Sequence, residues 1–72
     1  MNGAQLGLAW LKTKKHRHEQ QLAEVLSFIE KYPPRGYTAD AVVRGLRRWI
    51  AEDQYAIEIQ YKYFGNEIGE EA

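Results

Sequence analysis

The two histidines, His16 and His18, are the side chains of this chain best suited to metal or acid–base chemistry. Residues two apart project to the same side of a strand but to different sides of an α-helix, so the pair could chelate a metal only from a strand. The chain contains no cysteine, which excludes thiol nucleophiles, thiolate metal ligands and disulfides. We therefore expect no metal site and no cofactor.

A carboxylate beside an imidazole is the other arrangement with chemical potential. His18 and Asp53, with Glu19 or Glu52 nearby, could imitate a carboxylate–histidine site. Inside a pair of helices, however, such a contact is usually a satisfied polar layer that fixes the register of the helices. We expect Lys15, His18 and Asp53 to form a structural layer of this kind, and the protein not to be an enzyme.

Two amphipathic segments must position these residues. In each segment, apolar side chains recur with the period of an α-helix and form one stripe. The first stripe comprises Ala4, Leu8, Leu11, Leu22, Val25, Leu26 and Ile29. The second comprises Val42, Val43, Leu46, Trp49, Ile50, Ile57, Tyr61, Phe64 and Ile68. The pattern predicts helices over about 3–31 and 39–64.

Consecutive prolines at Pro33 and Pro34 end the first helix. Folding the segments antiparallel about this Pro-Pro turn, with Tyr32 opposite Ala39, places His18 opposite Asp53. The polar interruptions of the two stripes then coincide. The sequence thus predicts an all-α antiparallel helical hairpin over 1–72, a single small domain in which 65–72 form a short acidic tail and Gly65 is the cap.

Two further expectations follow from the same antiparallel alignment. Gln60 should lie near Leu11. Gly45 should lie near Leu26, where the missing side chain would allow the helices to approach closely.

Residues 55–64 also support a different fold. They alternate apolar and polar side chains and are rich in residues that favour strands. Under this interpretation the chain is a winged-helix-like α+β module with a strand at 55–64. A single strand needs a partner, and the helical phase continues through the same segment, so we favour the hairpin.

Size and charge limit the classes of function. The chain has 72 residues and a mass of 8.4 kDa, and ten basic side chains balance ten acidic ones. So short a chain without disulfides often needs a partner to become stable. A nucleic-acid-binding regulator is the alternative function, because basic residues cluster at 12–18 and 44–48. Its candidate contacts are Lys12, Lys14, Lys15, Arg17, Arg44, Arg47 and Arg48.

Several large apolar residues lie off the main stripes and on the same flank of the hairpin. We call this set the aromatic flank: Trp10, Phe28, Tyr32, Ala56, Ile59 and Tyr63. Its aromatic side chains are typical anchors of protein interfaces. We expect a small protein-binding adaptor, inhibitor or regulator located in the cytoplasm, without a membrane segment. The partner would be a second copy, pairing into a four-helix bundle, or a larger protein.

Overall fold

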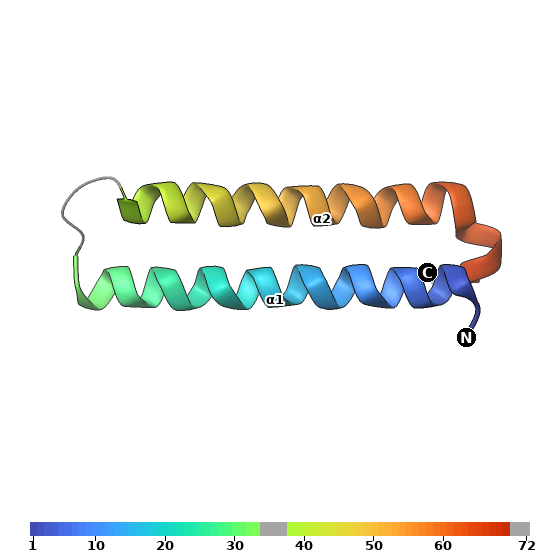
Figure 1. Cartoon of the computed structure of the whole chain (residues 1–72), viewed down its shortest axis with the longest axis horizontal. Coiled ribbons are helices and arrows are strands. Elements are labelled where there is room, and N and C mark those ends of the chain that lie inside the picture. Colours follow the sequence, from blue (N-terminus) through green and yellow to red (C-terminus); the bar gives the residue numbers. More distant parts are fainter. Residues whose placement is uncertain (34–37, 70–72) are drawn as a thin grey trace.

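Two antiparallel α-helices form the structure, a computed structural model that describes residues 1–33 and 38–69 (Figure 1). Helix α1 spans Gly3–Lys31 and helix α2 spans Thr38–Ile68. They lie side by side along a molecule measuring 49 × 17 × 16 Å. The predicted helical hairpin is therefore confirmed, and the first helix has the predicted bounds. Of the predicted Pro-Pro turn, residues 34–37 lie outside the described part of the chain.

The strand predicted as an alternative at 55–64 is wrong. All of these residues belong to α2. The segment contains Ile57, one of the most buried side chains, four residues after the buried Asp53. Burial at this spacing follows the helical period, and the described residues contain no strand with which 55–64 could pair.

Helix α2 ends later than the sequence suggested. Phe64 has non-helical backbone angles (φ −128°, ψ 20°), so the helix is kinked where we expected it to end, but it continues to Ile68. The terminating glycine is Gly69, with a φ of 83°, rather than Gly65. The amide of Gly69 donates to the Gly65 carbonyl oxygen at 3.0 Å, which is the usual bond of a left-handed helix cap. Residues 70–72 lie outside the described residues.

The start of α1 is tied to the end of α2. Asn2 and Gln5 form a capping box, in which each side chain accepts a hydrogen bond from the other residue's backbone amide. The Asn2 amide nitrogen also donates to the Glu67 carbonyl oxygen at 2.8 Å, and that of Gln5 donates to the Ile68 carbonyl oxygen at 3.2 Å. Two orphan carbonyls of α2 are thus satisfied by side chains of α1.

The interface between the helices is narrow. Leu8, Leu46 and Ile57 are the buried apolar side chains among the described residues, and Asp53 is buried with them. Other members of the two predicted stripes are only partly covered, and Leu26, Val42, Trp49 and Phe64 are exposed. Two helices can bury only one stripe each, so much apolar surface stays in contact with solvent.

The missing side chain of Gly7 makes room for a side chain of the other helix, whereas that of Gly45 does not. A Cβ atom built at Gly7 would lie 3.0 Å from the Gln60 amide nitrogen, which donates to the Ala4 carbonyl oxygen at 3.1 Å. Gln60 therefore contacts the first turns of α1, at Ala4 and Gly7. A Cβ atom built at Gly45 would meet nothing within 4 Å, so the predicted role of Gly45 in helix approach is wrong.

The Asn2 contacts predict a measurable contribution to stability. Asn2→Ala should lower the free energy of unfolding by about 1–2 kcal/mol, because it removes the helix cap and the bond to Glu67. Asn66→Ala is the matched control, since Asn66 is exposed and no such cap is lost. Urea denaturation of both variants measures the difference, and equal stabilities would contradict this assignment.

Candidate functional site

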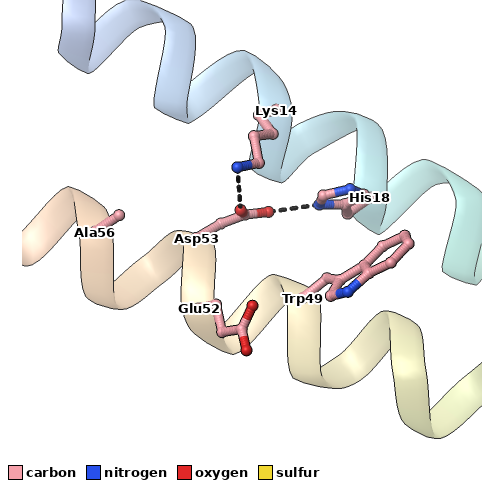
Figure 2. A pocket seen from close by; sticks show the side chains of 6 residues that line it. All are labelled: Lys14, His18, Trp49, Glu52, Asp53 and Ala56. Atoms are coloured by element: carbon pink, nitrogen blue, oxygen red, sulfur yellow. Dashed lines mark hydrogen bonds and ion pairs between the residues drawn. The ribbon is translucent and has the colours of Figure 1, made fainter.

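Asp53 is the one buried charged side chain among the described residues, with 3% of its surface exposed. It lies in the middle of α2 and points toward α1 (Figure 2). The Nδ1 nitrogen of His18 donates to its Oδ2 atom at 2.6 Å, and Lys14 Nζ lies 3.7 Å from Oδ1. Both carboxylate oxygens therefore have a partner from the opposite helix, which offsets the cost of burying the charge.

His18 is held by a second contact. Its ring lies 5.1 Å from the Trp49 ring, centroid to centroid, with the planes tilted by 44°. Trp49 precedes Asp53 by four residues, so both side chains reach His18 from the same side of α2. Sequence reasoning placed Trp49 in the core stripe, whereas 52% of its surface is exposed.

Lys15 does not belong to this layer. Its Nζ atom lies 3.6 Å from Glu19 Oε2 on the same helix, and Lys14 occupies the position beside Asp53. Lys14 and His18 are four residues apart and so lie on one side of α1, from which both reach the same carboxylate. The sequence predicted Lys15 in this position, and the structure shows that Lys14 faces Asp53 instead.

A solvent-open hollow of about 320 Å³ lies beside the Asp53 contacts. It is lined by Lys14, His18, Trp49, Glu52, Asp53 and Ala56 (Figure 2). None of these lining residues carries a hydroxyl or thiol nucleophile. Within residues 1–33 and 38–69, no group of three His, Asp or Glu side chains could hold a metal ion. The site therefore offers a fixed polar contact between helices and a shallow depression beside it.

A second, larger hollow of about 470 Å³ shares Trp49 with the first. Apolar residues form most of its lining, which consists of Gln21, Glu24, Val25, Val42, Gly45, Leu46 and Trp49. Because Trp49 borders both hollows, they lie on one flank of the hairpin and follow each other along its length. We call these two hollows together the groove. It is polar near Asp53 and apolar toward the proline end.

The aromatic flank borders this groove. Lys14 and Ala56, one from each helix, line the same hollow. Trp10 is one turn from Lys14, with its ring 5.0 Å from Lys14 Nζ, and Tyr63 follows Ala56 by two turns, so both lie on that side. The large aromatic members are 62–65% exposed, namely Trp10, Phe28, Tyr32 and Tyr63. Ala56 and Ile59 are half-buried.

The candidate nucleic-acid contacts do not form one patch. Lys12 lies over the Tyr61 ring at 5.7 Å, on the flank opposite Lys14, and Arg48 pairs with Glu52 at 3.8 Å. The remaining members, Arg17, Arg44 and Arg47, are exposed. Basic side chains are thus distributed around the hairpin.

Comparisons with protein-family models, with curated proteins and with solved structures find no match to this chain. Neither helix, in the residues that the structure describes, is long and apolar enough to cross a membrane. The function must therefore be argued from the geometry of the hairpin.

The buried contact between His18 and Asp53 predicts that substitutions of these two residues have non-additive effects on the free energy of unfolding. His18→Leu should lower the free energy of unfolding by about 2–3 kcal/mol, because Asp53 would keep its buried charge and lose its closest partner. The double variant with Asp53→Leu should recover to within about 1 kcal/mol of the natural protein. Urea denaturation of the two single variants and the double variant measures this coupling.

His16→Leu is the matched control for that cycle, since His16 is exposed two residues away and should change stability little. If the losses from His18→Leu and Asp53→Leu simply added in the double variant, the contact would not contribute in solution.

The two lysines provide a separate test of the register. Lys14→Met should lower the free energy of unfolding by about 1 kcal/mol, because it removes one of the two partners of Asp53. Lys15→Met should change the free energy of unfolding by less than about 0.5 kcal/mol, since a partly exposed ion pair on one helix contributes little. Thermal or urea unfolding measures both losses. A larger loss from Lys15→Met than from Lys14→Met would show that α1 is rotated relative to the structure.

Proposed function

We propose that this chain is a small, non-enzymatic protein-binding module that acts as an adaptor, inhibitor or regulator through its aromatic flank. The observation that carries this proposal is the position of four exposed aromatic side chains on the flank that holds two neighbouring hollows, both lined by Trp49. Interfaces concentrate their binding energy in such aromatic anchors and in the pockets that receive them.

The distribution of apolar side chains supports the proposal. An isolated exposed aromatic residue is common on protein surfaces, but several on one flank of a small hairpin, together with an apolar hollow, mark an interaction site. Trp10, Phe28 and Tyr63 contribute little to the contact between the helices, since most of their surface is exposed. Their presence is better explained by a contact outside the hairpin.

Pairing into a four-helix bundle is part of the same proposal. A hairpin buries one stripe per helix, whereas a bundle of four helices can bury two. The aromatic flank and the groove would then become the second buried layer of a homodimer. A larger protein could occupy the same flank in the same way.

The nucleic-acid alternative has less support. Four of its seven candidate residues are engaged within the hairpin, two of them with acidic side chains of their own helix. Binding to a phosphate backbone needs basic side chains on one surface, and these residues face several directions. We therefore retain protein binding as the proposed function.

Substitution on the flank tests this function. A variant combining Trp10→Ala and Tyr63→Ala should retain its helicity by circular dichroism, because both side chains are mostly exposed. The amount of partner protein that the immobilised chain retains should fall about tenfold or more, because interface aromatics are binding hot spots. Quantitative mass spectrometry measures this amount, and isotope-labelled copies of the chain itself are included among the proteins offered.

Tyr55→Ala is the matched control. Tyr55 is as exposed as Tyr63, at 65%, but it follows the inward-facing Asp53 by two residues and so points away from the hairpin. A partner retained by the natural chain and by Tyr55→Ala but lost by the double variant supports the proposal. Equal retention by all three would overturn it.

A further inference from the structure

We infer that the aromatic flank binds the same flank of a second copy, with the proline ends of both hairpins on the same side and Phe28 of each copy in the apolar hollow of the other. This inference rests on the proposed function and names its partner and geometry. It begins from side chains of the flank that one hairpin leaves exposed, aromatic residues at both ends and charged residues between them.

Two rows of side chains run along the flank, one on each helix. Successive members are alternately four and three residues apart, a spacing that keeps each row on one side of its helix. The row of α1 comprises Trp10, Lys14, Arg17, Gln21, Glu24 and Phe28. The row of α2 comprises Gly45, Trp49, Glu52, Ala56, Ile59 and Tyr63. Members of both rows line the two hollows of the groove, so the rows face the same way.

The register between two copies follows from the direction of the two-fold axis. A flank can meet the same flank of a second copy only if the axis lies in the plane between them. When this axis runs parallel to the helices, rotation moves no residue along the hairpin, and α1 of each copy lies on α2 of the other. The alignment that His18 and Asp53 set within one hairpin therefore also sets the register between the copies.

In this register, Trp10 fits a gap in the facing row. Trp10 precedes His18 by eight residues, and the middle of the interval from Ile59 to Tyr63 lies eight residues after Asp53. Because the helices are antiparallel, Trp10 is level with that interval along the hairpin. In the dimer, its indole packs between these two side chains of the second copy, as side chains interleave in a helix bundle.

Phe28 is placed at the apolar hollow of the second copy. It follows His18 by ten residues, whereas Val42 and Gly45 precede Asp53 by eleven and eight, so Phe28 is level with the space between them. Both of these residues line that hollow. Glycine weakens a helix interior, and a Cβ atom at Gly45 would meet nothing within 4 Å, so the hairpin itself does not require it. Its missing side chain instead makes room for the phenyl ring.

The charges in the middle of the flank are complementary in the same register. Arg48 and Glu52 are exposed and pair at 3.8 Å, whereas Arg17 and Glu24 are exposed and pair with no other residue that the structure describes. Arg17 is within two residues of the level of Glu52, and Glu24 is within one residue of the level of Arg48. Each Arg48–Glu52 pair thus faces a base and an acid of opposite charge, which favours this partner and this register.

The other two-fold arrangement brings like charges together. An axis in the same plane but perpendicular to the helices lays α1 on α1 and α2 on α2, in opposite directions. The register that joins Trp10 to Phe28 of the second copy then has its axis midway between them, which is the level of Glu52. Two Glu52 carboxylates would face each other there, at a cost that the parallel axis avoids.

One side of the hairpin has the size that a dimer contact needs. A second copy that lies along the full length of a side measuring 49 × 17 Å covers about 800 Å². Each partner in a standard protein interface buries about the same area. A copy in the inherited register covers the whole length, because the ends of the two hairpins coincide.

Gly45→Gln provides a test in which helicity and association change in opposite directions. Glutamine favours a helix more than glycine does and has space within the hairpin, so helicity by circular dichroism should not fall. Its side chain should displace Phe28 of the second copy, and the dimer dissociation constant should rise about tenfold by sedimentation equilibrium. In a Phe28→Ala background, the same substitution should change this constant by less than about twofold, because the contact is already lost.

Gly65→Gln is the matched control. A Cβ atom at Gly65 also meets nothing within 4 Å, but this residue follows Tyr61 by one turn and so lies on the flank of the Lys12–Tyr61 contact, opposite the aromatic one. The dissociation constant of this variant should match that of the natural chain. An equal rise from Gly45→Gln and Gly65→Gln would overturn the inference.

Cross-linking tests the direction of the axis, because the natural chain has no cysteine. A mixture of the single variants Arg17→Cys and Glu52→Cys should form a covalent dimer with a short thiol–thiol cross-linker, whereas each variant alone should remain mainly monomeric. A mixture of Arg17→Cys with Glu58→Cys is the control, since Glu58 precedes Tyr61 by one turn and lies on the opposite flank. Efficient cross-linking of Glu52→Cys alone would overturn the parallel arrangement.

The possible outcomes separate this inference from the proposed function. A mass of twice 8.4 kDa by light scattering, with selective cross-linking of the first mixture, supports the parallel dimer. A monomer that still loses a foreign partner on flank substitution overturns the dimer and leaves the proposed function intact. If flank substitutions change neither mass nor retention, both are overturned.

Discussion

A two-helix hairpin has only one internal contact, and the buried carboxylate of Asp53 determines how that contact is aligned. A charge with 3% exposure is tolerated because His18 and Lys14 supply partners from the other helix. Sliding α2 by one turn would remove these partners and leave an unpaired charge between apolar side chains, which costs several kcal/mol. An apolar residue in place of Asp53 would permit several registers of similar energy. The polar layer therefore selects one alignment.

The remaining contacts between the helices depend on this alignment. With His18 beside Asp53, Gln60 reaches the first turns of α1 and Gly7 leaves space for its amide. At the same end, Asn2 and Gln5 reach the last carbonyl groups of α2. These polar contacts occur at one end and in the centre, while the apolar contacts are few. Orientation of the helices thus relies on specific hydrogen bonds more than on a large core.

The periodicity of the sequence was sufficient to predict the two helices and the meeting of His18 with Asp53, because an antiparallel pair allows little freedom once its turn is located. It placed Lys15 rather than Lys14 in the polar layer, because the choice between these neighbours depends on side-chain geometry at Asp53. The end of α2 was also missed, because the kink at Phe64 lets the helix continue past Gly65 to the cap at Gly69. Trp49 lies at the margin of its stripe, where a small rotation of the helix decides between core and groove.

The small number of buried side chains between the two helices has a consequence for function. Because one stripe of each helix is sufficient for the hairpin, an aromatic side chain placed elsewhere is not required for the fold, and a glycine placed mid-helix weakens it. Trp10 and Gly45 are residues of these two kinds, and they lie equally far from the polar layer that sets the register. Contacts within one hairpin explain neither residue, since most of Trp10 is exposed and a side chain at Gly45 would meet nothing within 4 Å.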